Sequence, residues 1–316
     1  MTRRSGDEPV TTPAASDISV VIPYCNREQF IDEAIQSVLA QTLPPLEIIL
    51  VNDCSREASR RYLDRYAELC VILDLRVNVG LAGARNEGIR RARGRFIAFL
   101  DDDDIWEPTK LEVQARYMHD HPGCAAIHTA ICAFYAIGSE RIFDQKPSLL
   151  TLAQALQQPG EVMVSSLLIR ADVMRGLGGF DPRFRRAEDH EFQIRCAAAG
   201  YRIESIPEPL TRMRRQGHAS LTRRPGRMFA GHLRLCWKHR ALYRVVYGWR
   251  GIVSFLVASL EHDSGKVRYV GGAIRLLAVL LPVKWKVRPD YQEPVQGAVS
   301  PVALPVVSRA TNEAMS

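Results

Sequence analysis

The sequence has no closely spaced pair of cysteines. Its seven cysteines are widely separated, they form no CxxC motif, and their number is odd. This pattern argues against a disulfide framework and against a zinc site built on cysteine. We therefore predict free thiols, a reducing compartment and a cytoplasmic protein.

Long apolar runs are absent as well. The first 17 residues contain no apolar segment of the kind found in signal peptides, and we predict that residues 1–17 form a disordered lead-in. An apolar stretch at 266–288 is too short to span a bilayer and is interrupted by Arg275. Residues 291–316 are rich in Pro, Ala and Val, which predicts a flexible tail.

The composition is that of a globular protein with a basic bias. A chain of 316 residues with 47% hydrophobic and 24% charged residues can bury one large core, or form a main domain with an appendage. The formal net charge is +7, and the last third of the chain is strongly basic. Such a charge attracts anionic lipid, phosphorylated ligands or nucleic acid, and composition does not choose among them.

Strands and helices alternate over the first hundred residues. Apolar runs predict strands at 18–22, 47–51 and 96–100. Between them, the predicted helices span 28–41 and 57–69. This alternation indicates an α/β protein with a parallel sheet wound with helices.

Two further elements are predicted beyond residue 108. Thr109 and Glu112 have the spacing of a helix capping box, so we expect a helix that begins at Thr109. Residues 162–169 have the apolar pattern of another strand.

Four consecutive aspartates, Asp101 to Asp104, directly follow the apolar run at 96–100. Four adjacent carboxylates repel one another and raise one another's pKa, so we expect a cation beside them. Their oxygens are the ligands that Mg²⁺ and Mn²⁺ prefer, and α/β proteins bind ligands at the carboxyl ends of their strands. The cluster therefore predicts a divalent-cation site that holds phosphates. The alternative is a solvated acidic turn.

Two other groups of residues are expected near these aspartates. Asp53 follows the second strand, where a carboxylate accepts hydrogen bonds from a nucleobase or a ribose; alternatively it caps the next helix together with Ser55. Gly83 and Arg85 lie in a glycine-bearing turn that leads into a helix. There the backbone can approach a ligand, and the guanidinium can bind phosphate or an aspartate. The alternative is a turn followed by a surface helix.

Two candidates for acid–base chemistry lie later in the chain. Glu188 and Asp189 stand at the start of a predicted helix, where the helix dipole alone would stabilise them. The functional interpretation is that Asp189 acts as a general base on an acceptor hydroxyl. Arg214 and His218 lie in a basic segment, 212–222, that we expect near a departing diphosphate. An exposed loop histidine is the alternative for His218.

Together these residues resemble the family 2 glycosyltransferases of the GT-A fold. The likeness covers residues 18–222, and the order and separation of the matching segments are specific. The matching segments are VVIPYCNRE (20–28), LVNDCS (50–55), NVGLAGARNEGI (78–89), GRFIAFLDDDD (94–104), GGFDPRF (178–184) and AEDHEFQIR (187–195). The resemblance implies a Rossmann-like nucleotide-diphospho-sugar transferase fold for residues 18–222.

The resemblance also implies roles on the donor side of the site. Asp53 would contact the base of the nucleotide, and the family's Asp-x-Asp motif falls on Asp101 and Asp103. Asp103 would ligate Mn²⁺ or Mg²⁺, and Asp101 would face the ribose or a water bound to the metal. The full set of predicted nucleotide-sugar contacts is Pro23, Tyr24, Asp53, Gly83, Arg85, Asp101 and Asp102.

On the acceptor side, the resemblance implies that Asp189 is the catalytic base of an inverting transfer. Glu188 would orient this base or bind the acceptor, and Asp104 would support the metal site from behind. Arg214 and His218 complete the predicted acceptor and supporting residues.

These assignments predict an inverting, metal-dependent glycosyltransferase. It would move a sugar from a nucleotide-sugar, most often a UDP-sugar in this family, to a glycan or lipid-linked acceptor in cell-surface polysaccharide synthesis. One alternative is a metal-dependent nucleotidyltransferase, although no lysine-bearing glycine-rich motif lies near the first strand. Another is a non-catalytic basic protein that binds membranes through a degenerate enzyme fold. We expect no nucleic-acid partner.

The basic region after Thr222 predicts a helical extension over residues 223–290. Its arginines and lysines are interleaved with Leu, Trp, Tyr and Val, as in amphipathic helices. Three roles remain open for it. The helices pack on the catalytic domain, pair with another subunit, or lie on an anionic membrane at the inner face of the plasma membrane.

Overall fold

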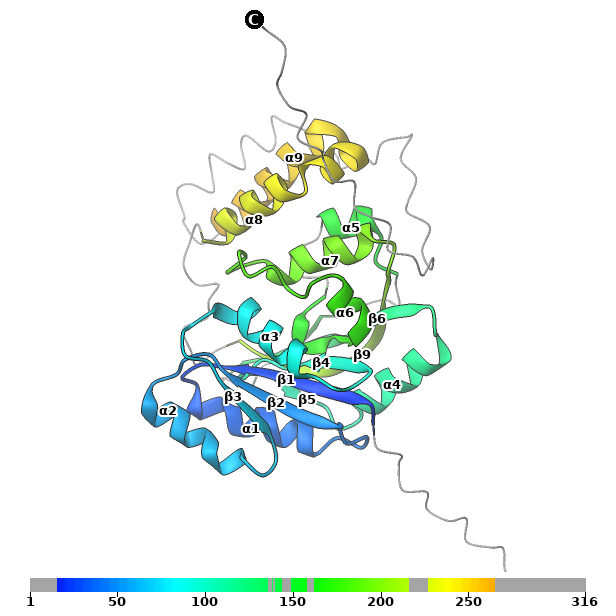
Figure 1. Ribbon diagram of the computed structural model, residues 1–316. Helices are drawn as coiled ribbons and strands as arrows, with labels where there is room; N and C mark the ends of the chain where they lie inside the picture. The colour runs from blue at the N-terminus through cyan, green and yellow to red at the C-terminus, as the bar shows by residue number, and fades with distance from the viewer. Residues whose placement is uncertain are drawn as a thin grey trace, which may run out of the picture.

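A mixed β-sheet forms the centre of the protein (Figure 1). The computed structural model describes residues 16–135, 138, 140–143, 149–157, 162–215 and 227–264. Four strands form the parallel half of the sheet, in the order β3-β2-β1-β4. They are β1 (Ile18–Tyr24), β2 (Glu47–Asn52), β3 (Val71–Asp74) and β4 (Phe96–Phe99).

The other half of the sheet begins where β8 (Leu168–Arg170) pairs antiparallel with β4. The order then continues through β6 (Cys124–Phe134), β9 (Arg202–Arg214) and β5 (Ile105–Trp106). The short strand β7 (Glu140–Phe143) pairs with β6. The point where parallel pairing changes to antiparallel therefore lies beside β4, the strand that leads into the aspartates.

Helices cover both faces of the sheet because its strands are apolar on both sides. Val21 belongs to one buried cluster, and its neighbours Val20 and Ile22 belong to the other. The first cluster includes residues of α3 (Gly80–Arg91), α5 (Leu152–Gln157), α6 (Ala171–Gly176) and α7 (Glu188–Ala198). The second includes residues of α1 (Glu28–Leu39) and α4 (Lys110–Asp120). The short helix α2 (Glu57–Tyr62) precedes β3.

Three local details differ from the predictions. Helix α4 begins after Thr109 as predicted, but the capping box is absent: the Thr109 side chain makes no cap, and Glu112 accepts a hydrogen bond from Thr42. The stretch 162–169 is not one strand: Val164–Ser166 is a 3-10 turn, and only Leu168–Arg170 pairs in the sheet. The helix predicted at 57–69 is two shorter pieces, α2 and a 3-10 turn at Leu63–Tyr66.

The predicted extension is helical and packs on the rest of the protein. Its described part contains α8 (Arg227–Lys238) and α9 (Arg240–Ser264), with a kink at Gly248. Leu235, Tyr243 and Phe255 are buried in the same cluster as α3, α6 and α7. Residues 1–15 and 265–316, which carry the predicted lead-in, tail and end of the extension, lie outside the described residues. Within the described part, no helix has the length and apolarity needed to cross a membrane.

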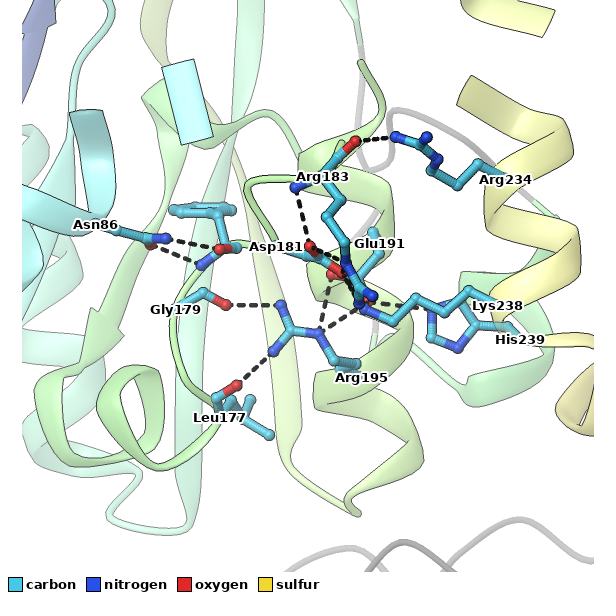
Figure 2. A network of polar contacts seen from close by, with 11 residues as sticks. Asn86, Leu177, Gly179, Asp181, Arg183, Glu191, Arg195, Arg234, Lys238 and His239 are labelled. Atoms are coloured by element: carbon cyan, nitrogen blue, oxygen red, sulfur yellow. Dashed lines mark hydrogen bonds and ion pairs between the residues drawn. The ribbon is translucent and has the colours of Figure 1, made fainter. Parts of the chain in front are cut away.

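A buried network of charges, which we call the latch, joins α7 to α8 (Figure 2). The Glu191 carboxylate on α7 is fully buried. Its Oε1 atom lies 2.9 Å from Arg195 Nε, 2.6 Å from Lys238 Nζ and 3.2 Å from His239 Nε2. Lys238 Nζ also lies 2.7 Å from Asp181 Oδ2, in the loop before α7. The latch therefore fixes the extension to the helix that begins with Glu188 and Asp189.

The latch predicts a loss of stability in acid. Burial alone would raise the pKa of Glu191, but its contacts with His239, Arg195 and Lys238 lower that pKa from 4.5 to about 2. A carboxyl whose pKa is lower in the folded than in the unfolded state stabilises the fold at pH values above its unfolded pKa. This stabilisation, roughly 3 kcal/mol for Glu191, is lost as pH falls from about 4.5 to 2. Urea unfolding as a function of pH measures this loss.

The variant Glu191→Gln tests the assignment. Because glutamine does not titrate, the variant's free energy of unfolding should decline less steeply than that of the wild type between pH 4.5 and 2. The exposed Glu57→Gln is the matched control, and its pH dependence should equal that of the wild type. Identical acid profiles for Glu191→Gln and the wild type would contradict the latch.

Candidate active site

The four aspartates follow β4 at the edge of the sheet where the parallel strands end. Leu100 N donates to Val21 O at 3.1 Å, so the chain stays beside β1 until the first aspartate. Asp102 then accepts a hydrogen bond from Cys25 N, just past the end of β1, at 3.3 Å. The cluster therefore lies between the ends of β1 and β4, as its position after a buried strand predicts.

Two guanidinium groups lie beside the aspartates and neutralise part of their charge, while the divalent cation stays a prediction. Arg27 Nη1 lies 2.9 Å from Asp102 Oδ1 and 2.6 Å from Asp103 Oδ2. Arg85 Nη2 lies 2.6 Å from Asp101 Oδ1. Charge-assisted contacts of this kind stabilise carboxylates that would otherwise repel one another.

The two buried carboxyls of the cluster, Asp102 and Asp104, have raised pKa values. Burial raises the pKa of Asp102 to about 7, against the lowering effect of Arg27. Burial and the charges of Asp103 and Asp101 also raise the pKa of Asp104 well above its usual range. Additional positive charge beside the cluster would therefore favour the ionised forms of these carboxyls.

Backbone and side-chain contacts hold the acidic loop in place. Asp101 N donates to Ser165 Oγ at 3.1 Å, and Trp106 Nε1 donates to Ser165 O at 2.7 Å. Arg214, at the end of β9, donates its backbone N–H to Asp104 Oδ1 at 3.2 Å and its Nε to Asp103 O at 3.2 Å. Arg214 thus lies at the site, as predicted, whereas His218 lies outside the described residues.

The start of α7 brings Glu188 and Asp189 to the same site. Arg85 Nη1 lies 2.9 Å from Glu188 Oε1, so this buried guanidinium joins Asp101 after β4 to the first residue of α7. Ala187 has a left-handed backbone with φ of 57°, which turns the chain into the helix. Burial first, and then the Glu188 carboxylate, raise the pKa of Asp189 above its usual range.

Asp53 caps a helix, but not the one that follows it. Its Oδ1 accepts from Val79 N at 2.7 Å and its Oδ2 accepts from Gly80 N at 2.9 Å, at the start of α3. The cap predicted for α2 is absent, since Arg56 precedes that helix and makes no side-chain cap. A carboxylate has about four acceptor positions, so two remain on Asp53 for a ligand.

The other predicted nucleotide contacts are well packed. Pro23 and Tyr24 end β1, and the Tyr24 hydroxyl is buried 2.6 Å from Ser59 Oγ. A Cβ atom at position 83 would lie 2.7 Å from Val79 Cγ2, so the absence of a side chain at Gly83 lets the first turn of α3 pack against Val79. Helix α3 therefore positions Arg85 beside the aspartates, and Gly83 and Asp53 fix the start of this helix.

Arg27 and Ser165 are the two site residues that the sequence analysis missed. Arg27 follows β1 by three residues, so its position after a parallel strand was a usable signal. Ser165 lies in the 3-10 turn that was interpreted as a strand, and no local pattern marks it.

The residues present fit a divalent cation that is carried with a diphosphate. Among the described residues, no group of three or more His, Cys, Asp or Glu is arranged to hold a metal by protein ligands alone. Mg²⁺ is commonly held by one or two carboxylates together with phosphate oxygens and waters. Asp101 and Asp103 supply two carboxylates, and the Asp101 side chain is 30% exposed.

Models of two related families match the chain. The model of Glycosyl transferase family 2 matches residues 19–170, which include β1, β2, β4 and the four aspartates. The model of Glycosyl transferase family group 2 matches residues 96–287, which include the aspartates, α7 and the extension. The two matches overlap over residues 96–170, which include the acidic loop.

Individual proteins give the same result. The putative teichuronic acid biosynthesis glycosyltransferase TuaG of Bacillus subtilis (strain 168) is 32% identical over 174 residues, which cover 49% of this chain and 69% of that protein. The amylovoran biosynthesis glycosyltransferase AmsE of Erwinia amylovora is 28% identical over 201 residues, covering 62% of this chain and 75% of that protein.

A solved structure shares the fold. The crystal structure of S. aureus TarS 1-349 in complex with UDP-GlcNAc superposes with a TM-score of 0.60 at 15% sequence identity, and covers 88% of this chain and 98% of that one. The family matches, and a sheet whose parallel strands end beside the acidic loop, show that this chain belongs to the family 2 glycosyltransferases and has their GT-A fold.

Proposed function

We propose that this enzyme transfers a sugar from a UDP-sugar to a hydroxyl of a glycan or lipid-linked acceptor, in the synthesis of a cell-surface polysaccharide. The observation that carries the proposal is the Arg85 bridge. It places Asp101, at the predicted donor side, and Glu188, beside the predicted base, on one buried guanidinium. Two related proteins are described as glycosyltransferases of teichuronic acid and amylovoran biosynthesis, and TarS was crystallised with UDP-GlcNAc, which supports this choice of donor and acceptor class.

On the donor side, the chain would bind the nucleotide along the ends of β1, β2 and β4. Asp53 keeps acceptor positions for N–H or O–H groups of the nucleoside, while its bonds to Val79 and Gly80 fix its orientation. Arg27, which now neutralises Asp102 and Asp103, is within reach of a diphosphate placed beside them.

We propose that Asp101 and Asp103 hold Mn²⁺ or Mg²⁺ together with the diphosphate. The ion would stabilise the negative charge that the nucleoside diphosphate gains as the bond to the sugar breaks. The Arg27 contact to Asp103 would then be released to the phosphates, so the protein keeps its charges balanced in both states.

On the acceptor side, Asp189 would act as general base. It would take the proton of the attacking hydroxyl at its carboxylate, while the oxygen forms the new bond to the anomeric carbon and the nucleoside diphosphate leaves from the opposite face. A single displacement of this kind inverts the anomeric centre. The raised pKa of Asp189 makes its carboxylate a stronger base than an ordinary aspartate.

Calorimetry with UDP, with and without Mn²⁺, tests the donor assignment. We expect UDP binding that requires the metal, and release of UDP from a UDP-sugar only when an acceptor or water accepts the sugar. A nucleotidyltransferase would instead bind a nucleoside triphosphate and release pyrophosphate from it. Absence of UDP binding, or a UDP affinity that is the same with and without Mn²⁺, would contradict the proposal.

The variant Asp103→Ala should weaken metal-dependent UDP binding by about tenfold or more, because one of two carboxylate ligands is lost. Calorimetric titration of UDP at saturating Mn²⁺ measures the change. Asp120→Ala, at the exposed end of α4, is the control and should bind UDP as the wild type does. Unchanged affinity in Asp103→Ala, with the metal still required, would show that another residue holds the ion.

A further inference from the structure

The helices of the extension present one exposed face to solvent. Trp237 is 72% exposed, Val245 is 56% exposed and Leu233 is 42% exposed, which is unusual for side chains of this size. Arginines lie among them, and the Arg240 guanidinium stacks 4.8 Å from the centre of the Trp237 ring. We call this the outer face, and its residues are Leu233, Arg234, Trp237, Arg240, Ala241, Arg244 and Val245.

The outer face is continuous because the helix continues through the junction of α8 and α9. His239 N donates to Leu235 O at 2.9 Å, and Tyr243 N donates to His239 O at 3.1 Å, so the helical phase is kept. Positions 233, 237, 240, 241 and 244 then fall on one side of the helix. The buried residues fall on the other side: Leu235, Cys236, His239, Tyr243, Val246 and Tyr247.

The segment of chain that carries this face has charged residues of one sign. The sequence contains no Asp or Glu between Glu208 and Glu261, while the same segment contains eleven Arg and Lys residues. An exposed tryptophan with leucine, valine and flanking arginines is the composition of helices that lie in a bilayer interface. Arginines beside such residues favour anionic lipids.

We propose that the outer face binds the surface of an anionic membrane. Trp237, Leu233 and Val245 enter the headgroup region, and the arginines contact the lipid phosphates. This interaction goes beyond the proposed function, since it does not depend on which sugar is transferred or on whether transfer occurs.

The membrane contact is rigidly connected to the active site. A side chain at Gly231 of α8 would meet Arg186 Cβ at 3.2 Å, and Arg234 donates to the carbonyl of Arg183. The latch adds the Lys238 contacts with Asp181 and Glu191 (Figure 2). The loop at 181–187, which these contacts hold, leads directly into Glu188 and Asp189 at the start of α7.

Vesicle flotation of the full chain tests the proposal. We expect the protein to float with vesicles of phosphatidylglycerol and phosphatidylcholine, to float poorly with phosphatidylcholine alone, and to be released by salt. The triple variant Trp237→Ala, Arg240→Glu, Arg244→Glu should lower the partition coefficient by about tenfold or more. These side chains are exposed, so thermal unfolding should show a folded variant.

A matched control removes the same kinds of side chain elsewhere. The variant Leu69→Ala, Arg61→Glu, Arg90→Glu changes the net charge equally and deletes an exposed apolar side chain, but leaves the outer face intact. It should bind vesicles as the wild type does. Absence of wild-type binding to anionic vesicles, or equal loss in both variants, would overturn the proposal. If the wild type does not bind vesicles but sediments as a dimer, and the first variant sediments as a monomer, a second copy of the chain covers the face.

Discussion

Replacing Asp189 with asparagine is expected to lower the rate of sugar transfer by about 10²- to 10⁴-fold, the usual contribution of a general base. Asparagine has the same shape but cannot take the proton of an acceptor hydroxyl. UDP affinity should remain nearly unchanged, because the base acts on the acceptor. Steady-state rates with a UDP-sugar, together with UDP calorimetry, measure the two quantities separately.

The pH dependence gives the same assignment a second readout. Because burial and Glu188 raise the pKa of Asp189, the wild-type rate should increase with pH as this carboxyl loses its proton. The residual rate of Asp189→Asn should lack that increase. The exposed Asp172→Asn is the control and should keep both the rate and the profile. A comparable loss of UDP binding in Asp189→Asn would mean that Asp189 belongs to the donor side.

Replacing Arg85 with methionine is expected to lower the free energy of unfolding by about 3–5 kcal/mol, the usual cost of removing one partner from a buried ion pair. The Arg85 side chain is 2% exposed and contacts both Asp101 and Glu188. Methionine fills much of the space but leaves both carboxylates without their cation. Urea unfolding at neutral pH measures the difference.

Arg90 on the same helix is the natural comparison. Its side chain is 61% exposed and pairs with Glu87 within the helix, so Arg90→Met should change stability by about 0.5 kcal/mol or less. If both variants lost the same stability, the Arg85 bridge would have no special structural role. Equal free energies of unfolding for Arg85→Met and the wild type at a pH above neutral would also contradict the bridge.

The parallel half of the sheet could be predicted from the sequence because its information is local. β1, β2 and β4 are short apolar runs, and helices lie between them along the chain: α1 between β1 and β2, and α2 and α3 between β2 and β4. Local alternation of this kind indicates a parallel sheet without knowledge of distant contacts. The carboxyl ends of these strands then predicted where Asp53 and the aspartates would lie.

The other half of the sheet, which combines antiparallel pairs with the parallel pair of β6 and β9, could not be predicted in the same way. β5 consists of Ile105–Trp106, which is too short to show a pattern, and it pairs with β9 more than a hundred residues later. Pro207 and Pro209 would favour the end of a strand at Ile206, yet β9 continues to Arg214. The register between β6 and β9 shifts between Thr129 and Ile131, and this shift accommodates the β9 residues after Ile206. The length of β9 therefore depends on its pairing with β6.

The site shows the same division. Asp101, Asp103 and Asp189 were predicted as site residues from their positions and from the family resemblance, but their partners could not be predicted. Arg85 contacts Glu188 across 103 residues of chain, and Ser165 supports Asp101 across 64. Such contacts are set by how the two halves of the sheet meet, which no local spacing encodes.

The hydrogen bond from Arg214 N to Asp104 has a consequence for synthesis of the protein. The two residues are 110 positions apart, so the acidic loop leaves the ribosome well before the strand that holds its last member. At about 5–20 residues per second, the delay is roughly 5–20 s. During that interval the nascent chain carries an incomplete acidic loop, and chains that terminate before β9 would expose the aspartates without the contacts from Arg214.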